Sequence, residues 1–215
     1  MQTEMERGMS KRIVGYEDMK MRVSDLIFRN DPNPRIWLDT GCGTGGLVRE
    51  NLDRFPRTQF ILADPSEDNI SVAKKYMHGE QRCLYVQRRS DELNFGDCTL
   101  DAVTAILCHH YYRDIEEKKK AVSNCFRMLR KGGIYVTVEH VRHDDQESTD
   151  REWLAHMRSS GLPDELAENM IERRDREYFP LTEAAHVQLL KECGFSDVEV
   201  FWSTCSDIGL VAIRR

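Results

Sequence analysis

The sequence has no hydrophobic run that approaches the roughly 20 apolar residues needed to cross a bilayer. Its first residues also lack the apolar core of a secretory signal peptide. Its seven cysteines are odd in number and form no Cys-x-x-Cys pair, which argues against a disulfide framework. We therefore expect a cytoplasmic protein with reduced thiols and no membrane partner.

The sequence also has no excess of positive charge. Lysine and arginine number 31 against 37 acidic residues, and the formal net charge is −6. This balance argues against nucleic acid as an obligatory partner. With 215 residues, 40% of them hydrophobic, the chain is long enough to bury a full core. We expect one domain, 1–215, without internal repeats.

A glycine-rich corner stands at residues 37–46. Residues 35–38 favour a buried strand and residues 47–52 a helix, so the chain turns through glycines from strand to helix. Such a corner binds anions and cofactors, because glycines leave room for a ligand and the helix start offers unpaired N–H groups. The glycines alone also fit a dinucleotide fingerprint. Asp39 helps to decide which ligand the corner binds. A carboxylate here suits a cationic group such as an amino-acid ammonium, although it could merely cap the turn.

Strands and helices alternate after this corner. We expect strands at 59–63, 83–86, 102–107 and 134–138, and helices at 66–76 and 114–129, the second ended by Lys131-Gly132-Gly133. Their apolar runs are too continuous for a half-exposed sheet. The alternation therefore predicts a parallel sheet covered on both faces.

The ends of the chain depart from this alternation. Residues 1–12 are polar and are expected to be loose, and 16–28 show helical spacing; together residues 1–30 form an N-terminal cap. Residues 141–180 hold two expected helices, 147–157 and 163–176, which we interpret as an insertion over the active site. A helix at 182–193 and a hairpin of strands 198–202 and 208–213 would close the fold.

Polar residues at the carboxyl ends of the expected strands are the candidate ligands. Asp64 ends the second strand and is placed to bind ribose hydroxyls, since ligands of open α/β sheets lie at this edge. Capping the next helix is the alternative, for which Ser66 is better suited. Ser90 and Asp91 follow the third strand and could lie near an adenine, or cap a turn.

Histidines follow the fourth and fifth strands. His110 could take a proton near neutral pH, and Glu139 is a second candidate base. A histidine that only positions a substrate fits equally well. Residues of metal-ligating types gather in this region: Cys108, His109, His110, Glu139, His140 and His143. Their spacings match no zinc signature, so we expect no metal site.

Several motifs, in order along most of the chain, resemble those of class I S-adenosylmethionine-dependent methyltransferases. They are Leu38-Asp39-Thr40-Gly41-Cys42-Gly43-Thr44-Gly45, Asp64, Leu93-Asn94-Phe95 with Leu100-Asp101-Ala102-Val103, His109-His110, Phe126 to Gly133, and Lys191 to Val200. The resemblance implies a Rossmann-like three-layer α/β/α sandwich with a helical cap. Its mostly parallel seven-stranded sheet would have the order 3-2-1-4-5-7-6, with the last strand antiparallel.

The resemblance also implies the cofactor, S-adenosylmethionine, and roles for single residues. Asp39 would lie near the methionine ammonium, Gly41 and Gly43 would admit the cofactor to the backbone, and Asp64 would bind ribose. Further positions assigned to the cofactor are Ser90 and Asp91 near adenine, with Cys42, Pro65 and Leu107 adjoining the motifs. Two departures affect the adenine pocket: Asn69 replaces a common methionine, and Arg88-Arg89 replaces a usual Gly-Asp.

We expect methyl transfer to a small-molecule acceptor, catalysed mainly by alignment, in a monomer or homodimer. His110 or Glu139 would serve as base if the acceptor loses a proton. The residues expected to contact the acceptor are Tyr16, His109, Tyr111 and His140. Three alternatives remain open: a nicotinamide-dependent oxidoreductase, a tRNA-modification relative that uses a carboxylated cofactor, and a non-catalytic regulator that binds S-adenosylmethionine.

Overall fold

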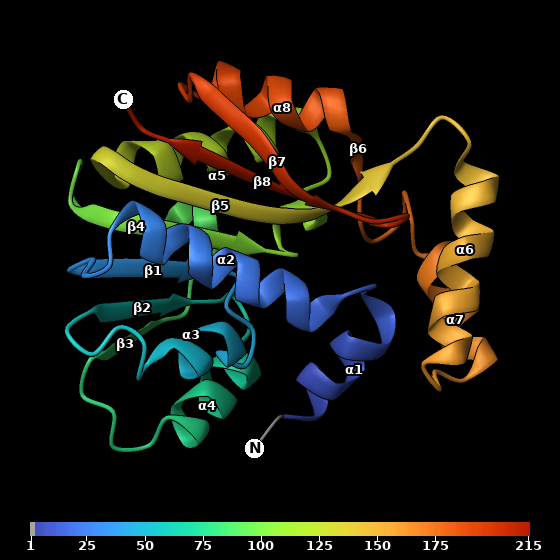
Figure 1. The fold of residues 1–215 in the computed structure, drawn as a ribbon, viewed down its shortest axis with the longest axis horizontal. Helices are drawn as coiled ribbons and strands as arrows, with labels where there is room; N and C mark the ends of the chain where they lie inside the picture. Colours follow the sequence, from blue (N-terminus) through green and yellow to red (C-terminus); the bar gives the residue numbers. More distant parts are fainter. Residues whose placement is uncertain (1–2) are drawn as a thin grey trace.

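The computed structural model describes residues 3–215. Its strands are β1 (Ile36–Thr40), β2 (Gln59–Ala63), β3 (Cys83–Val86), β4 (Leu100–Ile106), β5 (Leu129–Arg142), β6 (Leu181–Thr182), β7 (Asp197–Ser203) and β8 (Asp207–Ile213). They form one mixed sheet in the order β3-β2-β1-β4-β5-β8-β7, with the short β6 beside the end of β5 (Figure 1). β8 runs antiparallel to both β5 and β7. The predicted order 3-2-1-4-5-7-6 is confirmed, since β8 and β7 are its seventh and sixth strands.

Helices cover both faces of the sheet. They are α1 (Glu4–Arg12), α2 (Tyr16–Asn30), α3 (Gly46–Asn51), α4 (Glu67–Tyr76), α5 (Ile115–Met128), α6 (Gln146–Ser159), α7 (Asp164–Glu172) and α8 (Glu183–Glu192). Neighbouring residues of a strand point to opposite faces. Trp37 accordingly packs in the core cluster of α2, α3 and α4, and Leu38 packs in that of α5 and α8. Both faces are therefore buried, which explains the continuous apolar runs.

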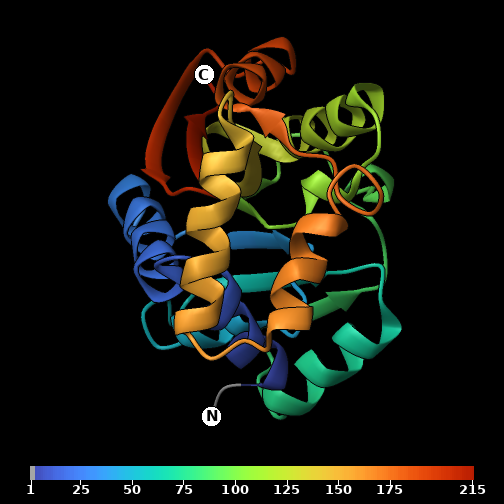
Figure 2. The same cartoon turned by 90° about the vertical axis from the view of Figure 1, so that its right-hand side faces the viewer.

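The helices α6 and α7 stand apart from the sheet, beyond the carboxyl ends of its parallel strands (Figures 1 and 2). They pack on each other through a small core that includes Trp153, Met157 and Met170. The indole Nε1 of Trp153 donates a hydrogen bond of 2.7 Å to the carbonyl of Arg12, which joins α6 to α1. Among residues 3–215, no helix is both long and apolar enough to cross a membrane.

The expectation of a loose N-terminus is wrong for residues 3–12. Thr3 and Glu6 form a capping box at the start of α1: Thr3 Oγ1 accepts from the backbone N–H of Glu6, and the carboxylate of Glu6 accepts from the N–H of Thr3. Thr3 also shares a 3.0 Å hydrogen bond with Thr44 in the glycine-rich corner. Met1 and Gln2 lie outside the described residues.

The glycine pair Gly132-Gly133 lies within a strand, where the sequence predicts a helix end. α5 ends at Met128, and β5 starts at once and carries both glycines in an irregular stretch beside β4. Gly132 has φ +77°, and a Cβ on Gly133 would lie 2.9 Å from the carbonyl oxygen of Arg130. Glycine is therefore required here by a bulge rather than by a helix cap.

α7 also ends at Glu172, four residues before its predicted end.

Candidate active site

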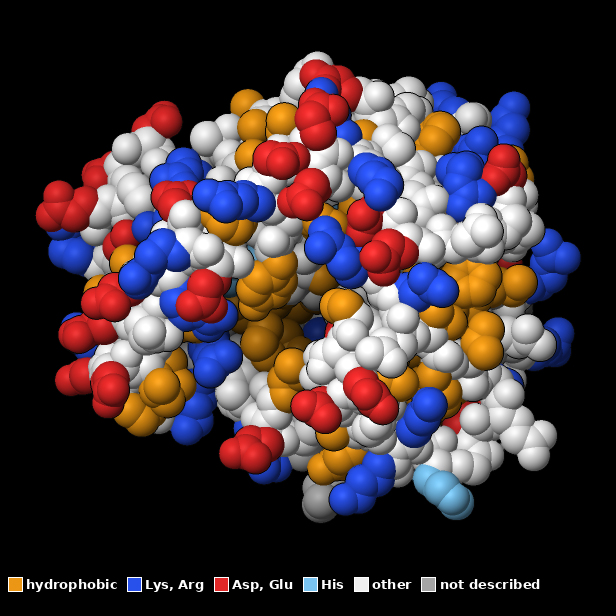
Figure 3. Space-filling view, turned by 180° about the vertical axis from the view of Figure 1, so that it is seen from behind, with side chains coloured by type: hydrophobic (Ala, Val, Ile, Leu, Met, Phe, Trp, Pro, Cys, Tyr) orange, Lys and Arg blue, Asp and Glu red, His pale blue; other side chains and the backbone are white. Residues whose placement is uncertain are grey.

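A cavity of about 600 Å³ opens where β1, β2, β4 and β5 end, and α1 and α7 form two of its walls. Figure 3, seen from behind, shows a hollow with hydrophobic walls and Lys and Arg side chains beside it. Its volume lies within the range of ligand sites. The cavity is lined by these residues singled out from the sequence: Tyr16, Asp39, Gly41, Cys42, Gly43, Asp64, Pro65, Ser90, Leu107, His110, Tyr111 and His140.

The loop between β1 and α3 is shaped by glycines with positive φ. Gly41 has φ +66°, and a Cβ there would lie 2.3 Å from the Cβ of Cys108. Gly41 is thus required by the close approach of the segment after β4. Gly43 has φ +53°, and its N–H donates to Asp64 Oδ2 at 2.9 Å. Leu107, in the same wall, adopts φ +55° although it is not a glycine, and strained backbone of this kind clusters at functional sites.

Asp39 places a buried carboxylate in this wall. Its Oδ1 accepts a 2.7 Å hydrogen bond from Thr104 Oγ1, which itself accepts from the indole of Trp37. Burial disfavours the charged form more than this hydrogen bond favours it, and the nearby Asp64 adds repulsion. Together they raise the pKa of Asp39 to about 7. A cation bound beside Asp39 would restore its charge, so the site suits a positively charged ligand group.

The carboxylate of Asp64 stands at the end of β2, next to the glycine loop. Its Oδ1 accepts from the backbone N–H of Ser66 and from Asn69 Nδ2, at 2.9 and 3.0 Å. Three donors, counting Gly43, thus fix its orientation in the cavity wall. The helix α4 is capped by Ser66, whose Oγ accepts from the N–H of Asn69. Asp64 itself is therefore available to a ligand that presents hydroxyl groups.

His110 and Glu139 form a buried pair at the ends of β4 and β5. The Nδ1 of His110 lies 3.0 Å from Glu139 Oε2. Burial and the neighbouring His140 lower the pKa of His110 to about 4. Burial opposes ionisation of Glu139, but the hydrogen bond and charge of His110 outweigh it and lower the pKa of Glu139 to about 2. The imidazole is therefore neutral at pH 7, with Nδ1–H donating to the carboxylate and Nε2 left as an acceptor.

A second histidine, His140, packs beside the first. The two rings lie 4.4 Å apart at 34°, and Tyr178 contacts both. The Nδ1 of His140 lies 2.7 Å from Oδ1 of the buried Asp207. Tyr111 adds a ring 4.4 Å from His110. His110, Tyr111 and His140 form an aromatic wall of the cavity, and Tyr178 packs behind the two histidines.

Comparisons with known proteins agree with this geometry. A family model described as a methyltransferase domain matches residues 38–133. The carboxy-S-adenosyl-L-methionine synthase of Trichodesmium erythraeum is 24% identical over 190 residues, 85% of this chain and 74% of that protein. A ubiquinone/menaquinone biosynthesis C-methyltransferase of Vibrio campbellii is 32% identical over 113 residues, 50% of this chain and 42% of that protein.

A solved structure shares the fold. Phosphoethanolamine N-methyltransferase 2 of Haemonchus contortus, in complex with phosphomonomethylethanolamine and S-adenosylhomocysteine, has a TM-score of 0.65 and 18% identity. The match covers 92% of this chain and 52% of that one. The matched family segment runs from β1 into β5 and includes the glycine loop, Asp64, His109 and His110.

The chain belongs to the class I S-adenosylmethionine-dependent methyltransferases.

Membership in this family decides between the two interpretations that the glycines left open. The methyltransferase uses S-adenosylmethionine as methyl donor, and the nicotinamide oxidoreductase is set aside. The cavity fits this donor chemically: Asp39 offers a buried carboxylate to an ammonium, Asp64 offers one to hydroxyl groups, and the glycine loop leaves backbone accessible between them.

Three residues expected at the site lie outside the cavity wall of the methyltransferase. Asp91 binds Tyr112 Oη at 3.0 Å and pairs with Lys120. His109 contacts Ser90 Oγ through Nε2 and Tyr135 Oη through Nδ1.

Glu139, the third of these residues, accepts hydrogen bonds from the backbone N–H groups of His109 and His110 and from Thr137 as well as from the ring of His110. A carboxylate held by so many donors is a poor base, and it orients His110 instead. Cys108, His109 and Glu139 bring ligand atoms within 4.8 Å of one another. These atoms are already engaged by protein groups, Cys108 Sγ with the carbonyl of Thr40 at 3.3 Å.

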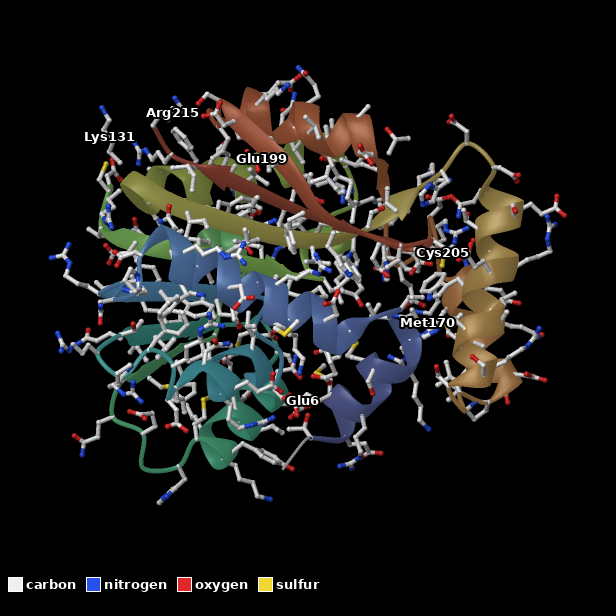
Figure 4. The ribbon with its side chains drawn as sticks, viewed as in Figure 1. Glu6, Lys131, Met170, Glu199, Cys205 and Arg215 are labelled. Atoms are coloured by element: carbon white, nitrogen blue, oxygen red, sulfur yellow. The ribbon has the colours of Figure 1, made fainter. Side chains whose placement is uncertain are left out.

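The helices α1 and α7 contribute cavity residues that are not among the predicted site residues: Met5, Glu6, Met9, Arg12, Met170 and Arg173. Glu6 is buried, pairs with Arg49 at 2.8 Å, and lies against Gly46 at the start of α3. Figure 4 labels Glu6 at this corner and Met170 on α7. The Thr3-x-x-Glu6 spacing of a capping box was the available signal for α1.

Proposed function

We propose that the methyltransferase transfers a methyl group to a small-molecule acceptor bound between the glycine loop and the aromatic wall, with His110 as the base. One observation carries this proposal. A single cavity brings together the two carboxylates suited to the donor, Asp39 and Asp64, and a neutral histidine held by a carboxylate.

The donor end of the cavity is assigned to the corner of β1 and β2. Asp39 would bind the ammonium of the donor, and Asp64 its ribose hydroxyls. Cys42, Pro65 and Ser90 complete the surface around them. When bound, S-adenosylmethionine supplies a methyl group on a positively charged sulfur. The protein then has to fix the direction from which an acceptor approaches.

The acceptor end is assigned to the aromatic wall. Nε2 of His110 accepts the proton of an acceptor hydroxyl or amine, and the ionised Glu139 stabilises the imidazolium that forms. Glu139 therefore acts as a positioning residue. Tyr111 and His140 supply flat surfaces that orient the acceptor. Closure by α1 and α7 excludes water that would otherwise compete for the base.

A small acceptor is supported by the volume of the cavity, about 600 Å³ for donor and acceptor together. It also agrees with the net charge of −6, which disfavours nucleic acid. Among the relatives, the Haemonchus enzyme is named for a small amine acceptor and the Vibrio enzyme for quinone biosynthesis.

A second candidate function is synthesis of a carboxylated donor. The observation that favours it is the extent of the matches: two relatives named carboxy-S-adenosyl-L-methionine synthase align over 85% and 90% of this chain. A carboxylate beside the sulfonium would need a cation, and arginines from α1 and α7 reach the same cavity. The catalytic product distinguishes the two candidates.

The test is incubation of the protein with S-adenosylmethionine and a panel of small phenols, amines, thiols and carboxylic acids, read by mass spectrometry. Formation of S-adenosylhomocysteine with a methylated product supports methyl transfer. His110→Gln should lower that rate by about 10²–10⁴-fold when an O–H or N–H acceptor is used, and the exposed His78→Gln should not. A donor that gains a carboxyl group would replace the proposal with the second candidate.

A further inference from the structure

We infer that the methyl acceptor is anionic and that Arg12 of α1 and Arg173 of α7 bind its carboxylate or phosphate group. This inference rests on the proposed function and names the class of its acceptor. It comes from the distribution of charge in the cavity, where Asp39 and Asp64 stand at the corner of β1 and β2, and Arg12 and Arg173 stand on the walls made by α1 and α7.

Arg12 lines the cavity without an acidic partner. Among residues 3–215 no ion pair or side-chain hydrogen bond is formed by its guanidinium, and its Nε is fully buried. A buried N–H group without an acceptor is costly, and such groups normally have a partner. The backbone of Arg12 is held by Trp153, whose indole donates to its carbonyl at 2.7 Å. The arginine is therefore positioned, and what it lacks is an anion.

Position along α1 separates Arg12 from the donor corner. Glu6, near the start of the helix, lies against Gly46 and pairs with Arg49. Arg12 ends the same helix, roughly 9 Å further along at the usual rise per residue. It lies at the junction of α1 with α6, toward the cap and away from the glycine loop. The anionic group that Arg12 binds therefore belongs to the acceptor rather than to the donor.

Arg173 reaches the cavity from the other wall, at the C-cap of α7. One turn earlier Met170 also lines the cavity, and its carbonyl accepts from Tyr178 Oη, whose ring packs on His140. Arg173 therefore lies one turn from the residue that Tyr178 holds beside the aromatic wall. Its Nε binds Glu177 at 2.6 Å, but Glu177 is more than half exposed. Such an exposed pair is weak and can yield to a ligand.

The other cations of the cavity are accounted for. Lys20 pairs with Glu17 and Glu50, and Arg89 pairs with Asp91. Arginine is suited to bidentate recognition of carboxylate and phosphate. An acceptor held at one end by Arg12 and Arg173 would present its other end to the aromatic wall and His110. The two arginines would therefore select acceptors that carry an anion at a set distance from the methylated atom.

The experiment is calorimetric titration of the protein, saturated with S-adenosylhomocysteine, with malonate and with inorganic phosphate. Malonamide serves as the neutral probe. The variants are Arg12→Gln, Arg12→Lys and Arg173→Gln, and the control is Arg176→Gln, which removes an exposed arginine of the same segment that does not line the cavity. Malonate and phosphate separate a carboxylate site from a phosphate site.

We expect at least one anion to bind the wild type and the Arg176→Gln control alike, and malonamide not to bind. Arg12→Gln and Arg173→Gln should weaken the anion by about tenfold or more, and Arg12→Lys should retain part of the affinity. S-adenosylhomocysteine affinity should be unchanged in all variants. Equal anion affinity in Arg12→Gln, or no anion binding to the wild type, overturns the inference. Loss of S-adenosylhomocysteine binding in Arg12→Gln also overturns it, by assigning this arginine to the donor. Failure of the wild type to bind S-adenosylhomocysteine would instead refute the proposed function.

Discussion

Replacing Asp39 by asparagine should stabilise the ligand-free methyltransferase at alkaline pH while it weakens binding of the donor. The fold raises the pKa of Asp39 from its ordinary 3.8 to about 7, chiefly through burial. An acid whose pKa is raised by folding binds its proton more tightly in the native state. The folded protein therefore loses stability as the pH rises from the pKa of Asp39 in the unfolded chain to its pKa in the folded protein.

The size of this effect follows from the shift. Between about pH 5 and about pH 8.5, ionisation of Asp39 should cost the wild type about 2–3 kcal/mol that Asp39→Asn does not lose. Asparagine can keep the hydrogen bond from Thr104, so the pH-independent effect of the substitution should be small. The measurement is urea unfolding of both proteins at the two pH values. The quantity compared is the change in their stability difference, which cancels any effect of the substitution that does not depend on pH.

Saturation with S-adenosylhomocysteine provides the control. Its ammonium should pair with Asp39, lower the pKa of this acid, and so reduce the pH dependence of the stability difference. The reasoning would be refuted by a stability difference that stays constant between the two pH values. It would also be refuted if Asp39→Asn bound the donor as tightly as the wild type.

Three further predictions concern the loop, the base and the first helix. Gly41→Ala should destabilise the protein strongly in urea unfolding, because its Cβ would lie 2.3 Å from that of Cys108. The control Gly79→Ala, also at positive φ but in open space, should cost only the backbone strain of about 1–2 kcal/mol. Equal losses of stability in the two variants would contradict the packing argument. Glu139→Gln should lower kcat with O–H or N–H acceptors and shift the pH profile of kcat, because Glu139 acts through His110. KM for the donor should stay constant. An unchanged pH profile would show that Glu139 does not have this role. Thr3→Ala should lower the free energy of unfolding by about 1 kcal/mol, because it removes the cap of α1. It should also raise the rate of amide hydrogen exchange in α1 but not in α5. Equal exchange rates in the variant and the wild type would show that the cap does not hold α1.

The sheet could be predicted because each parallel strand is an apolar run that ends in polar residues. The helix α1 escaped detection because polar groups attach it to the body of the protein. Its contacts include the hydrogen bonds of Thr3, the ion pair between Glu6 and Arg49, and the hydrogen bond from Trp153 to the carbonyl of Arg12, so hydrophobic periodicity carries little signal. The glycines of β5 were misplaced for a related reason. A bulge and a helix cap both require glycine, and only the pairing with β4 distinguishes them.

The site could be predicted to the level of the segment but not always to that of the residue. Consecutive residues in tight turns point in different directions. The turn of residues 109–111 sends His110 into the cavity and His109 toward Ser90 and Tyr135. The turn of residues 90–92 likewise leaves Ser90 at the cavity and Asp91 outside it. The convergence of Arg12 and Arg173 could not be predicted, because only the docking of α1 and α7 brings them to the same cavity.

The central claim is that the corner formed by β1 and β2 holds the donor, and calorimetry of S-adenosylhomocysteine tests it most directly. The wild type and two variants of equal charge change should be titrated: Asp64→Asn in the cavity and Asp53→Asn on the exposed surface. We predict binding on the order of micromolar for the wild type and for Asp53→Asn, and affinity weaker by about tenfold or more for Asp64→Asn. Equal affinity in all three proteins would contradict the claim and place the donor elsewhere.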